Sequence, residues 1–332
     1  MTIRNYLYDV LNAMARGLFA TLIMGTIIRQ VGIISGFIVL EQLGQIAMFL
    51  MGPGIGGAIA IGRGARPFTI LSAMVAGAIG AGMIVATGAG FMVITGEPVG
   101  ALLAAIAATE AGRLIEGRSK FDLLIIPAVV IITGGLVGLT IAPYIAAAMT
   151  ALGAFINNLT MLQPLLMGVL IAVFVGMMLT GPTSSVALCV AIGIDGLAAG
   201  AALAGCAAQM VGFAVISFRE NKFSGLISQG FGTSMIQFPN IIRNPLIWIP
   251  PTIAGAVGGG LSTMVFNMRT TSVGAGMGTS GLVGQFTTLT VMGEDALIPI
   301  ALLHFIIPAV VSLVIAEFMR SKKLIRFGDM QL

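Results

Sequence analysis

Charged residues are scarce in this sequence: Asp, Glu, Lys and Arg together make up 8% of its 332 residues. A soluble globular protein carries roughly 25% charged residues. Hydrophobic residues reach 58% and the mean hydropathy is +1.07, so a water-soluble fold would have too few polar side chains to cover its surface. We therefore expect an all-α membrane protein. At ~20 apolar residues per helical crossing, the length allows about ten crossings.

Residues suited to metal, redox or catalytic chemistry are also few. The sequence has one histidine, His304, and two cysteines, Cys189 and Cys206, neither of which has a CxxC partner. We therefore expect no disulfide, no metal site and no cofactor. The HExxH, P-loop and GxSxG motifs are absent, so an enzyme active site is not expected. The net charge of +4 comes without a basic stripe, which argues against nucleic acid as a partner.

The distribution of lysine and arginine predicts which loops face the cytoplasm. The loops at 63–66 and 113–120 carry arginine, whereas the turns at 36–41 and 89–98 carry no cation. By the positive-inside rule this alternation places the N-terminus in the cytoplasm, and the cations of 320–326 place the C-terminus there as well. The expected location is an inner membrane that the chain crosses several times.

Apolar runs separated by turns divide the sequence into spans and connectors. Residues 146–160 read as an interfacial connector, and 320–332 as a cytoplasmic tail. Two polar, glycine-rich segments, 226–244 and 274–292, are predicted to be re-entrant, because irregular backbone at membrane depth must be buried in protein or line a cavity. The predicted spans are 12–35, 42–62, 68–88, 99–116, 121–143, 162–180, 184–195, 197–218, 246–267 and 295–318.

Two halves of the sequence, 1–145 and 161–319, resemble one another. Residues 123–140 match 246–263, with a proline at the fifth position of each. Corresponding loops of the two halves carry opposite charge patterns, which predicts opposite sides of the membrane and hence an inverted repeat. The alternative is that apolar helices of low complexity align by chance.

Inverted repeats of this kind hold their substrate near the membrane midplane, between helices that are broken at matching positions. Here the predicted breaks are Gly52-Pro53 and Gly181-Pro182. Proline inside an apolar run removes a backbone hydrogen bond and clashes with the preceding turn. The alternative is two kinked helices that bind no ligand.

Three short segments, which we call the Gly–hydroxyl segments, place glycine and hydroxyl side chains before an apolar run: 181–185, 232–237 and 278–285. This order predicts an N-cap followed by a helix whose first amides suit a neutral hydroxylated ligand or an anion. The alternative is that the hydroxyls only cap re-entrant helices. Together with nearby amides, they give the candidate substrate-binding residues Gly181, Pro182, Thr183, Ser184, Gln209, Gly232, Thr233, Ser234, Gln237, Asn240, Gly278, Thr279, Ser280 and Gln285, with Gln229 and Asn244 close to them in sequence.

Ionisable groups inside the predicted spans are rare. Glu110 is placed to pair with Arg113 or Arg29, either as support for the site or as a buried pair that serves topology. His304 lies in the last span and is either a core histidine or a proton carrier.

Several stretches resemble one known family. They are Thr180–Ala187, Gly205–Phe213, Gln229–Asn240, Asn244–Pro251 and Gly274–Gln285. They are similar to the stand-alone group of phosphotransferase-system EIIC-like membrane proteins, of the perfringolysin-regulator type. The resemblance implies a bacterial inner-membrane protein, an EIIC-type fold with re-entrant segments, and a homodimer. It also implies sugar-type translocation, in which a substrate-carrying domain moves against a scaffold.

The sequence departs from the sugar-transporting EIIC pattern at one position. Those proteins typically carry a glutamate in a Gly-Ile-Thr-Glu-like stretch, and the comparable stretch here is Gly232-Thr233-Ser234-Met235. Glu110 occupies the pseudo-equivalent place in the first half. No EIIA-like or EIIB-like stretch is present, so we expect any phosphotransfer to need separate cytosolic components.

The sequence is compatible with two functions. The first is a permease for a small polar solute, sugar-like or anionic, working by an elevator or alternating-access movement. The second is a membrane sensor or regulator built on a transporter-derived fold, without sugar phosphorylation.

Overall fold

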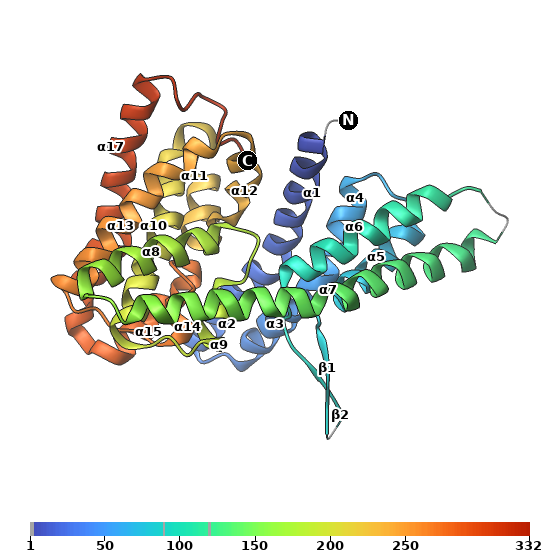
Figure 1. Cartoon of the computed structure of the whole chain (residues 1–332), viewed down its shortest axis with the longest axis horizontal. Helices are drawn as coiled ribbons and strands as arrows, with labels where there is room; N and C mark the ends of the chain where they lie inside the picture. The colour runs from blue at the N-terminus through green and yellow to red at the C-terminus, as the bar shows by residue number, and fades with distance from the viewer. Residues whose placement is uncertain (1–2, 89, 119–120) are drawn as a thin grey trace. The chain divides into compact units, whose positions relative to one another are not determined.

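The computed structural model describes residues 3–88, 90–118 and 121–332, which are mostly helical and include one β-hairpin. The chain forms two compact units, Met1–Ala148 and Met149–Leu332. Figure 1 colours the first unit from blue to green and the second from green to red. Whether these units correspond to the inverted halves of the sequence stays a prediction.

The first unit begins with a long apolar helix. Helix α1 (Ile3–Leu18) continues through a π-helical turn, Phe19–Ile23, into α2 (Met24–Ser35). Gly36, with φ of 69°, ends α2 in the left-handed conformation that glycine adopts readily. Helix α3 (Ile38–Phe49) then packs back on α2, with the backbones close enough that a methyl group on Gly25 would lie 2.8 Å from the Gly44 carbonyl oxygen.

Small residues bring the next three helices together: α4 (Met51–Gly62), α5 (Pro67–Gly80) and α6 (Pro98–Ile115). A methyl group on Gly52 would lie 2.8 Å from the Gly77 carbonyl oxygen of α5. Close backbone approach between small residues is typical of helices that pack in a membrane. One buried cluster here joins Ala60, Ala73, Ala76 and Ala108 of these helices to Ile126 and Val130, which follow α6 in the chain.

A β-hairpin interrupts the helices of the first unit (Figure 1). Strand β1 (Ile84–Thr87) pairs antiparallel with β2 (Gly90–Val93), and Ile84 lies opposite Val93. The predicted span 68–88 is therefore wrong beyond Gly80. The β-branched residues after Gly80 favour an extended backbone, and apolar composition alone does not separate a strand from a helix end.

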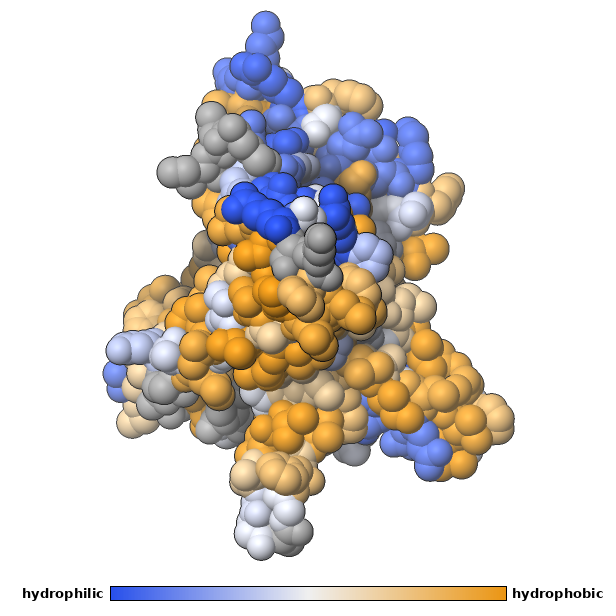
Figure 2. Space-filling view, turned by 90° about the vertical axis from the view of Figure 1, so that its right-hand side faces the viewer, coloured by the Kyte–Doolittle hydropathy of each residue, from blue (hydrophilic) through white to orange (hydrophobic). Residues whose placement is uncertain are grey.

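Helix α7 (Asp122–Thr160) is the longest element, at 39 residues. Residues 146–160, expected as an interfacial connector, form its second half. Large apolar side chains are exposed along its first half, as lipid contact requires, and Figure 2 shows apolar residues gathered on this end of the first unit. The exposed ones are Leu123, Leu124, Ile125, Ile132, Leu136 and Leu139.

The second unit is built around α10. Nearly all residues of helix α10 (Gly196–Ile216) are buried, and the helix is flanked by α8 (Pro164–Thr180) and α13 (Ile249–Met264). A methyl group on Gly205 of α10 would overlap the Ala172 carbonyl group of α8. The remaining elements are α9 (Ser185–Ala191), α11 (Phe218–Ile227), a π turn (Ser228–Gly232), a 3-10 turn (Ser234–Gln237), α12 (Phe238–Arg243), a 3-10 turn (Pro245–Trp248), α14 (Ser272–Ala275), a 3-10 turn (Ser280–Leu282), α15 (Val283–Met292), a 3-10 turn (Gly293–Ala296), α16 (Leu297–Ile300), a π turn (Ala301–Ile306) and α17 (Ile307–Ser321).

Fewer helices than predicted are long and apolar enough to cross a membrane. Within the described residues there are five, or six if the pair α3 and α4, bent by 54°, is one span. The predicted segments 226–244 and 274–292 consist of short helices and turns, but their re-entrant placement stays a prediction, as does the count of ten crossings. The five are Asn5–Ser35, Pro98–Ile115, Asp122–Ala142, Gly196–Ile216 and Ser280–Ser321.

Candidate functional site

The three Gly–hydroxyl segments meet in the second unit. The hydroxyl groups of Thr180, which directly precedes the first segment, and Ser234 of the second lie 2.7 Å apart. Ser185 donates to the Gly276 carbonyl at 2.8 Å, and Thr279 donates to the Gly230 carbonyl at 2.5 Å. Each segment, or a residue within two positions of it, therefore contacts another segment or the residues just before it. We call this meeting point the convergence.

The first Gly–hydroxyl segment separates two helices. Helix α8 ends at Thr180, and Pro182 cannot continue it because proline has no amide hydrogen. Thr183 donates its hydroxyl back to the Met178 carbonyl at 3.3 Å. The Ser184 carbonyl accepts from the Leu188 amide and so starts α9.

The second segment begins with the N-cap that its sequence predicts. Thr233 has an extended backbone after Gly232, and its hydroxyl accepts a hydrogen bond from the Met235 amide at 3.2 Å. Ser234 follows with its side chain fully buried. The cap therefore turns the chain so that the next hydroxyl faces Thr180.

The third segment depends on glycine for its backbone. Gly278 and Gly281 have φ of 54° and 52°, and Leu282 follows at 57°. A methyl group on Gly278 would lie 2.8 Å from the Met210 sulfur and 3.0 Å from the Cys206 carbonyl oxygen of α10. Glycine thus allows both the left-handed turn and the close approach to α10. Ser280 is buried in the 3-10 turn that follows.

Gln209 of α10 joins the convergence to α13. Its carbonyl oxygen accepts from the Thr180 hydroxyl at 3.2 Å and from the Trp248 indole at 3.0 Å. Its amide donates to the Thr252 hydroxyl at 3.1 Å. Trp248 and Thr252 are outside the predicted set. The sequence feature that could have identified them is the tryptophan itself, which is the only one in the sequence. A threonine follows it one helical turn later, directly after Pro250-Pro251.

Gln285, the last residue of the third segment, forms a buried pair with His304. The Gln285 amide nitrogen lies 3.0 Å from His304 Nδ1 and also 3.3 Å from the Gly278 carbonyl oxygen. His304 lies in the π turn Ala301–Ile306. Single π turns inside α-helices are frequent at functional sites. Within the described part of the chain, Gln285 Oε1 and His304 Nε2 are buried and have no hydrogen-bond partner. Both atoms therefore keep hydrogen-bonding capacity that the described residues do not use.

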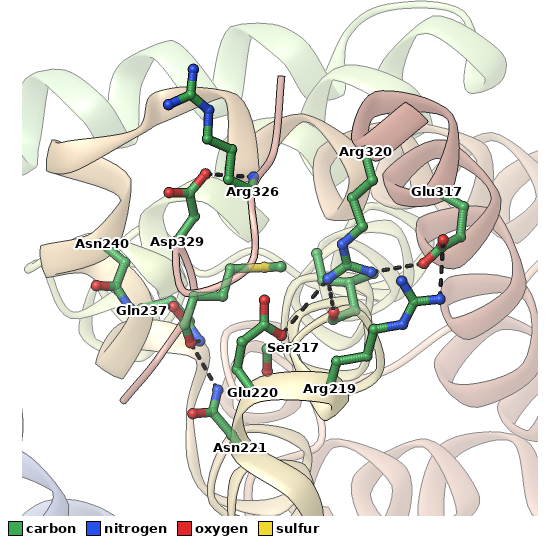
Figure 3. Close-up of polar contacts among 12 residues, drawn as sticks. Ser217, Arg219, Glu220, Asn221, Gln237, Asn240, Glu317, Arg320, Arg326 and Asp329 are labelled. Atoms are coloured by element: carbon green, nitrogen blue, oxygen red, sulfur yellow. Dashed lines mark hydrogen bonds and ion pairs between the residues drawn. The ribbon is translucent and has the colours of Figure 1, made fainter. Parts of the chain in front are cut away.

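Gln237 and Asn240 have different partners. Their side-chain amides donate at 2.9 Å to the carbonyls of Met330 and Gln331, so they hold the segment 325–332 (Figure 3). Gln229 donates to Ser217 at 2.8 Å and accepts from Gln237 at 2.9 Å, and Asn244 donates to Asp329 at 2.7 Å. Residues 325–332, which belong to the segment expected as a cytoplasmic tail, are therefore packed against the rest of the second unit, with Ile325 and Met330 buried.

The remaining candidates belong to the first unit. The bend between α3 and α4 lies at Leu50, and Gly52 and Pro53 occupy the first turn of α4. Glu110 pairs with Arg113 at 2.9 Å, which is one of the two partners predicted for it.

Two further groups complete the surroundings of Glu110. Its carboxylate pairs with Arg63 at 2.8 Å and accepts from the Tyr6 hydroxyl at 3.1 Å. Arg63 also lies 4.5 Å over the Tyr6 ring. Arg29, the other predicted partner, lies 3.7 Å from Glu41 instead.

Comparison with known proteins assigns the family. The family model described as "Phosphotransferase system, EIIC" matches residues 8–332, nearly the whole chain. No match was found among curated proteins or among solved structures. EIIC domains are the membrane transport component of that system and are not its catalytic part, and the apolar helices agree with an integral membrane protein. The chain belongs to the EIIC family of the phosphotransferase system.

Proposed function

We propose that this chain is a permease for a small, neutral, hydroxylated solute of the sugar type, and that the convergence and the Gln285–His304 pair bind it. The proposal also includes a bacterial inner membrane, an inverted repeat, a homodimer and separate cytosolic phosphotransferase components. Membership of the EIIC family by itself implies only a membrane transport component, and these further properties are part of our proposal.

The chemical character of the convergence supports a neutral solute. Its polar groups are hydroxyls, carboxamides, an indole and an imidazole, and no lysine or arginine takes part in the hydrogen bonds described for it. Sites that bind anions in low-dielectric surroundings usually supply a cation or several free amides. A solute rich in hydroxyl groups can exchange hydrogen bonds with these side chains without the cost of burying a charge.

The single observation that carries the proposal is the unsatisfied pair of atoms, Gln285 Oε1 and His304 Nε2. A buried polar atom without a partner costs about 1–3 kcal/mol. A solute that supplies a hydroxyl donor to Gln285 Oε1 and complements His304 Nε2 recovers that cost. Binding energy is thus available at this position.

The hydrogen bonds of the convergence indicate a closed state. Thr180, Ser234 and Gln209 satisfy one another, so a solute can reach these groups only after they separate. We infer that an elevator or alternating-access movement opens the contact between α8 and the 232–237 segment. The solute then replaces the bonds between the protein's own hydroxyls.

The test is uptake by proteoliposomes that contain the purified full-length chain. Labelled neutral sugars and polyols are compared with organic acids and sugar phosphates. We expect at least one neutral sugar to enter, and the Gln285→Leu variant to lose about tenfold or more of that uptake, because a buried hydrogen bond worth about 1.4 kcal/mol corresponds to tenfold.

Thr290→Val is the matched control, because the Thr290 hydroxyl is exposed and bonds only to the Phe286 carbonyl of its own helix, at 2.9 Å. Uptake of anions alone would contradict the choice of a neutral solute. Normal uptake by a folded Gln285→Leu protein would remove that residue from the site. If no compound binds or moves, a sensor on a transporter-derived fold replaces the permease.

A further inference from the structure

A basic cavity lies at the end of the second unit where α17 stops (Figure 3). Its volume is about 370 Å³, larger than a phosphate group needs. Four of its six lining residues are cationic, and the other two are apolar. They are Arg219, Arg320, Lys323, Ile325, Arg326 and Phe327.

Two distant stretches of the sequence build this cavity. Arg219 belongs to the first turn of α11 and pairs with Glu317 of α17 at 3.2 Å. Arg320 pairs with Glu317 at 2.8 Å, lies 3.8 Å from Glu220 and donates to the Ile216 carbonyl at 2.6 Å. Because its side chain is only 12% exposed, Arg320 is held in place before any ligand arrives.

The cations of the cavity outnumber the carboxylates that face them. Glu317 and Glu220 lie against Arg219 and Arg320, whereas no ion pair is described for the side chains of Lys323 and Arg326 within residues 121–332. The nearby Asp329 carboxylate is engaged by the Arg326 backbone amide at 2.8 Å and by Asn244. The cavity therefore keeps an excess of positive charge.

The position of the cavity points to the membrane surface. The candidate span Ser280–Ser321 ends beside it, so the cations follow directly on a long apolar helix. Large apolar side chains around them are exposed: Phe318 by 62%, Leu324 by 44% and Phe327 by 78%. Cations beside exposed aromatic and aliphatic groups at a helix end are typical of the region of lipid headgroups.

We propose that this cavity binds the phosphate group of an anionic phospholipid. Lys323 and Arg326 supply charge to the phosphate oxygens, and Arg320 supplies a guanidinium of fixed orientation. Phe327 and Leu324 contact the upper part of the acyl chains. A soluble phosphate compound offers the same charge but no apolar part, so it leaves these two side chains exposed to water.

The test uses the purified full-length chain in detergent micelles, with bound lipid counted by native mass spectrometry. Phosphatidylglycerol is titrated against phosphatidylcholine, and inorganic phosphate and glycerol 3-phosphate form separate arms. We expect one phosphatidylglycerol to bind in preference to phosphatidylcholine. Lys323→Gln and Arg326→Gln should each weaken it about fivefold, the loss that one lysine or arginine near a membrane surface is worth.

Lys322→Gln is the matched control. It removes one charge from the neighbouring residue, whose ammonium lies 5.9 Å over the Phe318 ring and does not line the cavity. A smaller loss for Lys322→Gln than for Lys323→Gln supports the site. Equal losses would mean diffuse attraction and would overturn it. Saturable binding of either soluble phosphate, with no preference for phosphatidylglycerol, would also overturn it. All variants are checked for unchanged thermal unfolding.

Discussion

The hydroxyl oxygen of Thr180 lies 2.7 Å from that of Ser234, 54 positions further along the chain. Thr180 also donates its one hydrogen to Gln209 Oε1, which can only accept. Ser234 must therefore be the donor to Thr180. The chain of hydrogen bonds thus runs from Ser234 through Thr180 to Gln209, and it links the second Gly–hydroxyl segment to α8 and α10.

This chain of hydrogen bonds should contribute measurably to stability. Thr180→Val keeps the shape of the side chain but leaves the buried Ser234 hydroxyl without its acceptor, which costs about 1–3 kcal/mol. Combining it with Ser234→Ala should cost less than the sum of the two by about 1 kcal/mol, since they share one interaction. The free energy of unfolding in mixed micelles measures both. Strict additivity would mean that the two hydroxyls do not interact.

Close packing of α8 against α10 should make Gly205 sensitive to a single methyl group. Gly205→Ala overlaps the Ala172 carbonyl group, so we expect destabilisation of about 1–3 kcal/mol. Gly258→Ala is the matched control in α13, where the nearest atoms to a new methyl group are 3.8 Å away. It should be neutral or stabilise by up to about 1 kcal/mol, because alanine favours a helix. Equal unfolding free energies for the two variants would refute the contact.

The segment 325–332 should behave as part of the second unit. Met330 is fully buried, so Met330→Ala should lower the free energy of unfolding by about 2–5 kcal/mol. Leu332→Ala, at a side chain that is 51% exposed, should change it by less than about 0.5 kcal/mol. Thermal unfolding of the two variants in the same detergent gives the comparison. A free tail would instead show no effect of Met330→Ala.

Glu110 should stabilise the first unit without contributing to solute affinity. Its carboxylate already has Arg63, Arg113 and Tyr6 as partners, so it has little capacity left for a ligand. Because the side chain is 34% exposed, Glu110→Gln should cost only about 1 kcal/mol. Solute affinity and unfolding are measured on the same variant. Loss of affinity at unchanged stability would instead support Glu110 as the substitute for the glutamate that the second half lacks.

Composition was enough to predict a helical membrane protein, because so few charged residues cannot cover a water-soluble fold. It was not enough at 84–93, where β-branched residues after Gly80 form a hairpin in a stretch partly predicted as helix. The Gly–hydroxyl segments were visible because glycine and hydroxyls in that order have a defined local role. Their partners were not, since Thr180 and Ser234 meet only through the packing of distant helices.

The hydrogen-bond partners of Gln237 and Asn240 could not be predicted from the sequence either. Both are amides in a polar, glycine-rich segment, which is why the sequence groups them with the substrate-binding candidates. Their partners are backbone carbonyls of Met330 and Gln331, about 90 positions away. A backbone carbonyl is present at every residue, so no pattern in the sequence identifies which one an amide will choose.

Equilibrium binding of a neutral sugar tests most directly whether the convergence binds a neutral solute. The sugar used is the one that enters proteoliposomes most readily. Isothermal titration compares the wild-type chain, the Thr233→Val and Ser234→Ala double variant, and the Thr290→Val control. We expect the double variant to stay folded and to lose binding, while Thr290→Val binds as the wild type does. Unchanged affinity in the double variant, or binding only of anions by the wild type, would contradict it.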